Sequence, residues 1–275
     1  MLVYCGISGG LCHRLRSVVG GAMLARELGV PLRIQWDLTR LCNVRVGEYL
    51  DIDGCEIAYR VEERKPQMFG VLSAEQIEAV RARVAAGERV CFHGCTFHVG
   101  NRARVVAFVR DRVRPTARLE SLLGELWGRA AERGLELPWA LACHVRRTDN
   151  ERSITRSPTS GFVSAVRSAG LDRAGAALYL ATDAPETEVP AFRGALRCRV
   201  VTLRELLTEA EALDLDRGSA RGMELALLEL FTLALAPRVL GSYGSAFSDV
   251  AAVLAATRVP VGLWERRARA GGGAP

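Results

Sequence analysis

Short apolar segments alternate with longer amphipathic ones along this chain, and this alternation constrains its fold more than any other feature. Strands that alternate with helices pair in parallel and need helical cover on both faces of the sheet. The pattern therefore predicts an α/β protein with parallel sheets. The expected strands lie at residues 2–7, 31–36, 89–92, 139–145, 177–181, 199–202 and 238–240.

The segments between these strands have the apolar spacing of helices. Gly29 is expected to end the first helix, and Ser73 with Gln76 forms a capping-box pattern at the start of another. The expected helices lie at residues 10–28, 73–86, 102–113, 119–133, 159–169, 203–213, 222–235 and 245–256.

The length of 275 residues allows two α/β units of ordinary size. The strand and helix pattern begins again after a junction between residues 115 and 137. We therefore expect two Rossmann-like domains facing each other across a cleft, with a single large sheet as the alternative. The expected boundaries are 1–115 and 116–269, followed by a disordered tail at 270–275.

The composition, 49% hydrophobic and 25% charged, is that of a soluble globular protein and excludes a disordered or fibrous chain. Its 37 basic residues include one lysine, Lys65, so the positive charge is almost all arginine. Codon bias explains this, and so does binding of oxyanions by guanidinium groups. Only the location of each arginine decides between the two. An arginine-rich helix at 102–114 suggests nucleic-acid binding, but its basic residues are interleaved with acids and aromatic residues are few.

The chain shows no signal-peptide pattern, and charged residues or proline interrupt its longest apolar stretches. We therefore expect a cytoplasmic protein, no membrane span, and reduced thiols for its eight cysteines. Cys91, His93, Cys95 and His98 resemble half of a zinc site, but no second pair follows at the required spacing. The two Asp-x-Asp pairs, at 51–53 and 214–216, lack the context of a cation site, so no metal is expected.

Ligands of open parallel sheets bind beyond the carboxyl ends of the strands, so a binding site is expected among the residues at those ends. After the first strand, Gly9-Gly10 opens a helix whose N-terminus suits an anion, and Arg14 and Arg16 lie nearby. The loop has neither the G-x-G-x-x-G nor the Walker A spacing. A tight connection without a ligand is the alternative, and the neighbouring Arg14 and Arg16 favour an anion site.

Three later strand ends are also polar. The strand at 139–145 leads into His144-Val-Arg146-Arg147-Thr-Asp149, where alternation aims His144 and Arg146 to the same side. Arg147 and Asp149 are expected to form a structural ion pair, which leaves Arg146 for a phosphate or pyrophosphate. Asp183 follows the next strand as a helix cap or a ligand. The strand at 238–240 leads into a serine-rich helix start, which either caps the helix or cradles phosphate.

These segments resemble those of one enzyme family. Residues 144–149 are similar to the H-x-R-R-x-D signature of the α-1,6-fucosyltransferases and the protein O-fucosyltransferases. Residues 178–183 resemble their second conserved strand, and 241–248 their serine-rich third motif. Residues 9–15 resemble the G-G-L-G-N-Q-L loop of related fucosyltransferases. Order and spacing agree over most of residues 1–262.

The resemblance implies a GT-B fold that binds the acceptor on the N-terminal half and GDP-fucose on the C-terminal half. It also implies metal-independent, inverting transfer. By position, Arg146 binds the donor β-phosphate and stabilises the departing GDP. His144 contacts the nucleotide, and Ser245 helps to hold the pyrophosphate.

The chain departs from the family pattern at several positions. Counting back from Ser242, the carboxylate that recognises guanine falls on Glu229, where the family usually has aspartate. Cys12 and His13 replace glycine and asparagine in the first loop. The carboxylate proposed as base in the α-1,6 enzymes falls near Ile154, so Glu151 becomes the nearby candidate. Asp149, His13 and His93 are further candidates for that role.

The sequence thus predicts a glycosyltransferase, with fucose from GDP-fucose as the expected donor and a small-molecule or oligosaccharide hydroxyl as acceptor. The alternatives are a transferase that uses another nucleotide sugar and a non-catalytic nucleotide-binding protein. The predicted site residues are Arg146 and Glu151 for catalysis; Gly10, His13, Arg14, His144, Arg146, Asp149, Asp183, Glu229 and Ser245 for the donor; and Asp51, His93 and His98 on the acceptor side.

Overall fold

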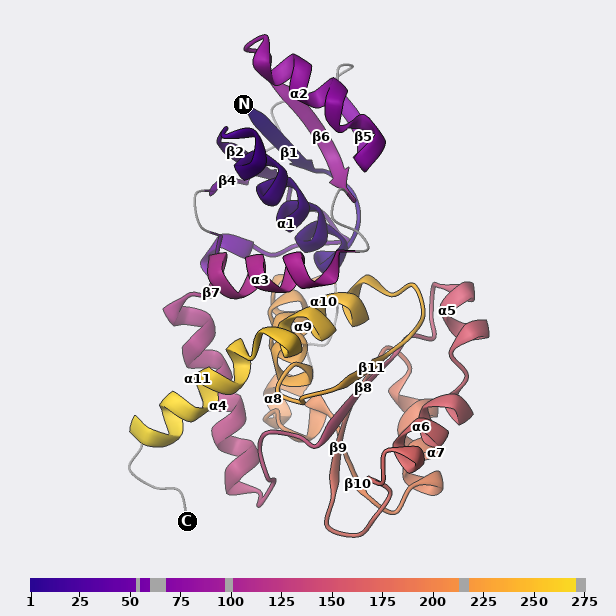
Figure 1. The fold of residues 1–275 in the computed structure, drawn as a ribbon. Coiled ribbons are helices and arrows are strands. Elements are labelled where there is room, and N and C mark those ends of the chain that lie inside the picture. Colours follow the sequence, from indigo (N-terminus) through magenta and orange to yellow (C-terminus); the bar gives the residue numbers. More distant parts are fainter. Residues whose placement is uncertain (53–54, 60–67, 97–100, 213–217, 271–275) are drawn as a thin grey trace. The chain divides into compact units, whose positions relative to one another are not determined.

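The computed structural model of the chain describes residues 1–52, 55–59, 68–96, 101–212 and 218–270. The chain divides into two compact units (Figure 1). The N-terminal unit comprises Met1–Leu119 with Asp216–Glu224, and the C-terminal unit comprises Glu120–Leu215 with Leu225–Pro275.

A five-stranded parallel sheet forms the centre of the N-terminal unit, in the order β4-β2-β1-β6-β5. A short antiparallel pair, β3 with β7, lies apart from this sheet. The strands are β1 (Leu2–Gly6), β2 (Leu32–Trp36), β3 (Leu50–Ile52), β4 (Cys55–Ala58), β5 (Met68–Leu72), β6 (Val90–Cys95) and β7 (Val113–Pro115). The helical segments are α1 (Leu11–Leu28), η1 (Val46–Glu48), η2 (Ala74–Gln76), α2 (Ile77–Ala85) and α3 (Arg102–Arg112).

Helix α1 packs closely on this sheet. A β-carbon at Gly21 would lie 2.5 Å from the Phe92 ring, so the absence of a side chain there lets α1 approach β6. Gly29 ends the helix in the left-handed conformation, at φ 66°, as the sequence predicts. The capping box of Ser73 and Gln76 is also confirmed.

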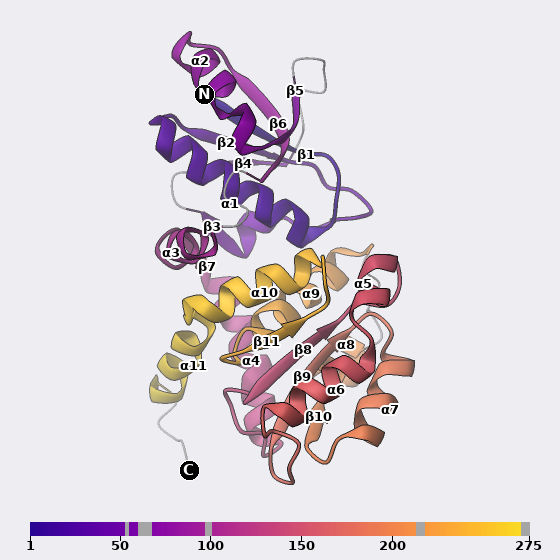
Figure 2. The same ribbon diagram turned by 45° about the vertical axis from the view of Figure 1, so that its right-hand side comes forward.

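The C-terminal unit has a four-stranded parallel sheet in the order β10-β9-β8-β11. Helices α6 and α7 lie on one side of this sheet, and α4, α9 and α10 on the other (Figures 1 and 2). The strands are β8 (Leu141–Val145), β9 (Ala177–Thr182), β10 (Arg199–Val201) and β11 (Val239–Gly241). The helical segments are α4 (Ala117–Glu132), α5 (Glu151–Arg156), α6 (Thr159–Ser168), α7 (Pro185–Ala195), η3 (Leu203–Glu205), α8 (Glu209–Ala212), α9 (Ala220–Leu233), α10 (Ala246–Thr257) and α11 (Val259–Ala270).

Alternating residues of this sheet form two apolar layers. Leu141, Cys143 and Val145 of β8 pack with residues of α6 and α7 in one layer. On the other face, Trp139 stacks on Tyr179, with ring centroids 5.4 Å apart. Both faces of β8 are therefore covered, as expected of a central parallel strand.

Every strand predicted from the sequence is present, and the parallel α/β class is confirmed. The helix expected at 203–213 is wrong, because η3 and α8 are separate short segments there. Four further strands of the N-terminal unit, β3, β4, β5 and β7, were not predicted. The part of the expected tail at 271–275 lies outside the described residues.

The division between the units differs in detail from the expected one after residue 115. Thr116 donates from its backbone to the Tyr49 carbonyl (2.9 Å) and from its hydroxyl to the Glu48 carbonyl (2.7 Å). Arg118 forms ion pairs with Glu48 (2.8 Å) and Glu224 (3.0 Å). These contacts hold the first turn of α4 and the first turn of α9 in the N-terminal unit.

Candidate functional site

The order of strands identifies the expected ligand site in each sheet, at the carboxyl ends of two neighbouring central strands. From β8 the chain moves outward through β9 to β10, and β11 then pairs on the opposite side of β8. Ligands of open α/β sheets bind at such a switch point, beyond the carboxyl ends of the two central strands. His144 and Gly241 are paired across β8 and β11, so the polar segments that follow them begin side by side.

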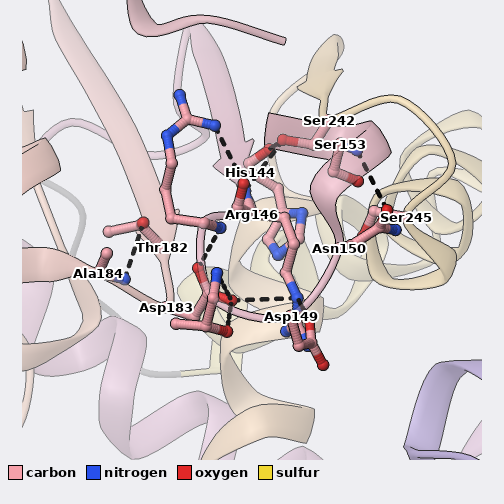
Figure 3. A network of polar contacts seen from close by, with 12 residues as sticks. His144, Arg146, Asp149, Asn150, Ser153, Thr182, Asp183, Ala184, Ser242 and Ser245 are labelled. Carbon is pink, nitrogen blue, oxygen red and sulfur yellow. Dashed lines mark hydrogen bonds and ion pairs between the residues drawn. The ribbon is translucent and has the colours of Figure 1, made fainter. Parts of the chain in front are cut away.

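Ser242 ties these two strand ends together (Figure 3). Its backbone amide donates to the His144 carbonyl (3.1 Å), and its hydroxyl accepts from the backbone amide of Arg146 (2.9 Å). The same hydroxyl is 3.3 Å from the His144 carbonyl. Ser242 is buried and fixes the backbone from which Arg146 projects. Ser242 was not among the predicted site residues, although its place in the serine-rich motif was a usable signal.

The ring of His144 is buried against α10. It stacks on Phe247, with centroids 4.8 Å apart, and its Nδ1 lies 2.8 Å from the Ser248 hydroxyl. A β-carbon at Gly241 would lie 2.4 Å from the Ser248 β-carbon, so glycine permits this close approach of α10. The orientation of His144 is therefore set by the N-terminal turn of that helix. Its predicted contact with a nucleotide stays a prediction.

Arg146 lies between two carboxylates (Figure 3). Its Nε is 2.7 Å from Oδ1 of Asp149 and 3.0 Å from Oδ2 of Asp183, and its Nη2 is 2.5 Å from Oδ1 of Asp149. The Arg146 side chain is 22% exposed, so it reaches solvent beyond the carboxyl end of β8.

The expected ion pair between Arg147 and Asp149 is wrong. Arg147 instead turns toward α6 and α7, where its Nε lies 2.7 Å from Glu188 and its Nη2 donates to the Thr159 hydroxyl (3.1 Å). Asp149 pairs with Arg146. The reason is that consecutive side chains after a strand point in opposite directions, so Arg146 and Arg147 meet different neighbours.

Asp183 organises the loop after β8. Its carboxylate accepts from the backbone amide of Arg147 (2.7 Å) and the hydroxyl of Thr148 (2.6 Å), in addition to pairing with Arg146. The expected helix cap is wrong, because the residue before α7 is Ala184 and no side chain caps that helix. The Asp183 side chain is 3% exposed. Its observed contacts are with Arg146 and the loop, and its place among the donor-binding groups stays a prediction.

Helix α10 begins at the same end of the sheet. Ser245 is the buried N-cap of this helix, and its hydroxyl accepts from the backbone amide of Ser248 (3.5 Å). An oxyanion bound here would meet the positive end of the helix dipole. Ser245 thus has the cap role that the sequence allowed, at a position suited to phosphate.

Helix α5 lies beside the carboxyl ends of these strands, and it was not predicted. The Ser153 hydroxyl donates to the Tyr243 carbonyl (2.5 Å), and the Tyr243 amide donates to the Ser157 hydroxyl (2.8 Å). These bonds attach α5 to the loop after β11. Glu151 lies exposed in the first turn of α5, and Ile154 is partly exposed one turn on.

Glu229 lies on α9, half-buried in the C-terminal unit. The buried Tyr179 hydroxyl of β9 is near enough that the Glu229 charge raises the tyrosine pKa, after the larger effect of burial. The structure thus places this carboxylate against the sheet. Its recognition of a base stays a prediction.

The corresponding switch point of the N-terminal unit lies between β1 and β6, and the Gly9-Gly10 loop follows β1. Gly9 has φ 77°, and a β-carbon there would lie 2.6 Å from the His13 ring. His13 is exposed at the start of α1. Partial burial of its ring still lowers the pKa of His13, and the positive charges of Arg16, His93 and Arg14 lower it further.

Arg14, a predicted donor-binding group, lies inside the N-terminal unit. Its side chain is fully buried and donates to the Gly9 carbonyl (3.0 Å), the Asp37 carbonyl (2.5 Å) and the Thr39 hydroxyl (2.8 Å). Its guanidinium also lies over the Trp36 ring, 5.4 Å from the centroid. These hydrogen bonds hold the Gly9-Gly10 turn to the loop after β2, and the predicted role of Arg14 in donor binding stays a prediction.

The acceptor-side candidates lie in different sheets. Asp51 is exposed on β3, paired with Arg114 of β7, whereas His93 is on β6 of the main sheet. His98 lies outside the described residues.

Among the described residues, no group of three or more His, Cys, Asp or Glu side chains is placed to hold a metal. In the same part of the chain, none of the helices has the length and apolar character to cross a membrane.

The fold of this chain is similar to the folds of two solved fucosyltransferases. NodZ, an α-1,6-fucosyltransferase from Bradyrhizobium, is 16% identical with a TM-score of 0.59, and the match covers 91% of this chain and 92% of NodZ. NodZ soaked with GDP-fucose also gives 0.59. POFUT1 in complex with GDP is 12% identical with a TM-score of 0.52, covering 95% of this chain and 96% of POFUT1. No family model and no curated protein sequence matches the chain.

These likenesses define the class of fold. The chain has the fucosyltransferase-like GT-B fold, with one parallel-sheet α/β unit in each half, as the resemblance implied.

Proposed function

We propose that this protein is an inverting, metal-independent glycosyltransferase that moves fucose from GDP-fucose to a hydroxyl of a small-molecule or oligosaccharide acceptor. The observation that carries this is the position of Arg146. It projects from the switch point of the C-terminal sheet, beside the N-terminus of α10, in a chain whose fold matches fucosyltransferases over more than nine-tenths of its length.

Transfer breaks the bond between the sugar C1 and the β-phosphate oxygen, and negative charge develops on the departing diphosphate. A guanidinium offers paired donors to such an oxyanion, and the α10 N-terminus adds its dipole. Donors that are held in place before reaction stabilise this charge best. Ser242 and Asp183 hold the backbone and side chain of Arg146 in this way. The metal-independent part of the proposal follows from the resemblance, with Arg146 carrying the charge-stabilising role.

The acceptor hydroxyl loses its proton as its oxygen bonds to C1. We assign this proton to Glu151, the exposed carboxylate in the first turn of α5. Positive charge on the sugar in the transition state makes C1 strongly electrophilic, so the acceptor hydroxyl does not need a strong base. Asp51, His93 and His98 remain the proposed acceptor-side residues.

A donor with a different base is favoured by one observation: the residue at the base-recognition position is Glu229, where the resembling family usually has aspartate. Thermal-shift measurements with GDP, UDP, TDP and ADP test both possibilities. We expect GDP to raise the melting temperature most, and Glu229→Ala to remove that preference. Glu132→Ala, an exposed change at the end of α4, is the matched control. Stabilisation by none of the four nucleotides would overturn every transferase assignment.

A further inference from the structure

The guanidinium of Arg146 has a different kind of carboxylate on each side (Figure 3). Asp183 is 3% exposed and also accepts hydrogen bonds from the amide of Arg147 and the hydroxyl of Thr148. Asp149 is 66% exposed and lies on the loop between β8 and α5. One carboxylate is therefore locked into the fold, and the other can move into solvent.

The exposed carboxylate occupies donors that an oxyanion needs. Asp149 takes both Nε (2.7 Å) and Nη2 (2.5 Å) of Arg146 through a single oxygen. Carboxylates and phosphates bind the same paired N–H groups of a guanidinium. A phosphate oxygen bound to this edge of Arg146 therefore competes directly with Asp149.

We propose that Asp149 is a displaceable counter-ion, which holds the anion-binding edge of Arg146 until the diphosphate of a nucleotide replaces it. This inference rests on the proposed function, since it concerns the same anion site. Asp183 keeps Arg146 attached to the loop while Asp149 leaves. The loop carrying Arg146 does not have to rearrange, because Ser242 and Asp183 hold it independently of Asp149.

Displacement makes the site selective for multiply charged anions. A singly charged anion replaces one negative charge by another and gains little at Arg146. A diphosphate brings additional charge, which the N-terminus of α10 can accommodate. The cost of displacement is small, because an exposed ion pair stabilises a protein only slightly.

Calorimetric titration with GDP and with inorganic pyrophosphate tests the inference in Asp149→Asn. This change keeps the shape of the side chain and removes its charge. We expect both probes to bind about two- to fivefold more tightly than to the unaltered protein at low salt, which is the size of effect that an exposed ion pair supports. The gain should shrink at high salt because the lost competition is electrostatic. Glu186→Gln, an exposed change of equal charge on α7, should leave both affinities unchanged.

Binding to Asp149→Asn that is equal to or weaker than that of the unaltered protein would overturn the inference, since Asp149 would then only position Arg146. Absence of pyrophosphate binding in both proteins would also overturn it. Tighter pyrophosphate binding without any GDP binding would support the counter-ion and refute the proposed function, so the two failures are distinguishable. Asp149→Ser provides the same test if the asparagine variant does not fold.

Discussion

Replacing Glu188 by glutamine tests whether the loop that carries Arg146 depends on the ion pair behind it. Glu188 lies 2.7 Å from Nε of Arg147 and also accepts from the Thr159 hydroxyl (2.9 Å). The side chains of the pair are only 12% and 8% exposed. Glutamine keeps the shape but leaves the Arg147 charge without a counter-ion.

Removing one partner of a buried ion pair costs about 3–5 kcal/mol, and the residual exposure of this pair places the expected loss near the lower limit, at about 3 kcal/mol. For a unit of this size, 1 kcal/mol lowers the melting temperature by about 2–4 °C, so we expect a decrease of about 6–12 °C. Thermal unfolding followed by circular dichroism measures it. Replacing both partners, in Glu188→Gln with Arg147→Met, should recover most of the loss because no charge remains buried.

The exposed pair of Arg266 with Glu120 provides the control for this prediction. Its atoms are 3.3 Å apart and its side chains are 66% and 45% exposed. Glu120→Gln should therefore cost less than about 1 kcal/mol. An equal effect of the Glu188 and Glu120 changes would refute the assignment of Glu188 as the support of the loop.

Two further predictions concern the N-terminal unit. Gly9→Ala should destabilise the protein by about 1–2 kcal/mol through its left-handed backbone and further through a clash with the His13 ring. Gly175, at φ 85°, has open space around it, so Gly175→Ala should show the backbone effect alone. Equal losses of stability in thermal unfolding would contradict the close approach of Gly9 to His13. Burial raises the pKa of Glu224, but hydrogen bonds from Tyr49 and two arginines outweigh this and lower it. The stability that Glu224 contributes is thus present above pH 4.5, its ordinary pKa, and is lost as the pH falls through its lowered value. Tyr49→Phe should therefore move acid unfolding to higher pH. An unchanged midpoint would show that the 2.6 Å bond between Tyr49 and Glu224 is not formed.

The strands of the switch points could be predicted from the sequence because their apolar runs are strong and bounded by polar residues. The run from Leu141 to Val145 is buried at every position, so its signal does not depend on a partner. By contrast, β4 (Cys55–Ala58) is a short edge strand of half-buried and exposed residues, and its pairing with β2 decides its conformation. Such tertiary pairing leaves little trace in the local pattern.

The site shows the same division. The sequence identified Arg146 as the anion-binding candidate because a guanidinium at the end of a buried strand is conspicuous. It placed Arg14 beside the first loop but gave no sign that Asp37 and Thr39, which follow the second strand, use its donors. The pairing of Arg147 with Glu188 joins residues 41 positions apart, so the sequence alone favoured the nearer Asp149.

The release of GDP from GDP-fucose, with water taking the fucosyl group, tests the central claim most directly, measured for the unaltered protein and for Arg146→Ala. Arg152→Ala is the matched control, since Arg152 is exposed on α5. We predict that the unaltered protein and the Arg152 variant release GDP, and that the Arg146 variant loses this activity while keeping its melting transition. Near-normal turnover in Arg146→Ala would contradict the account.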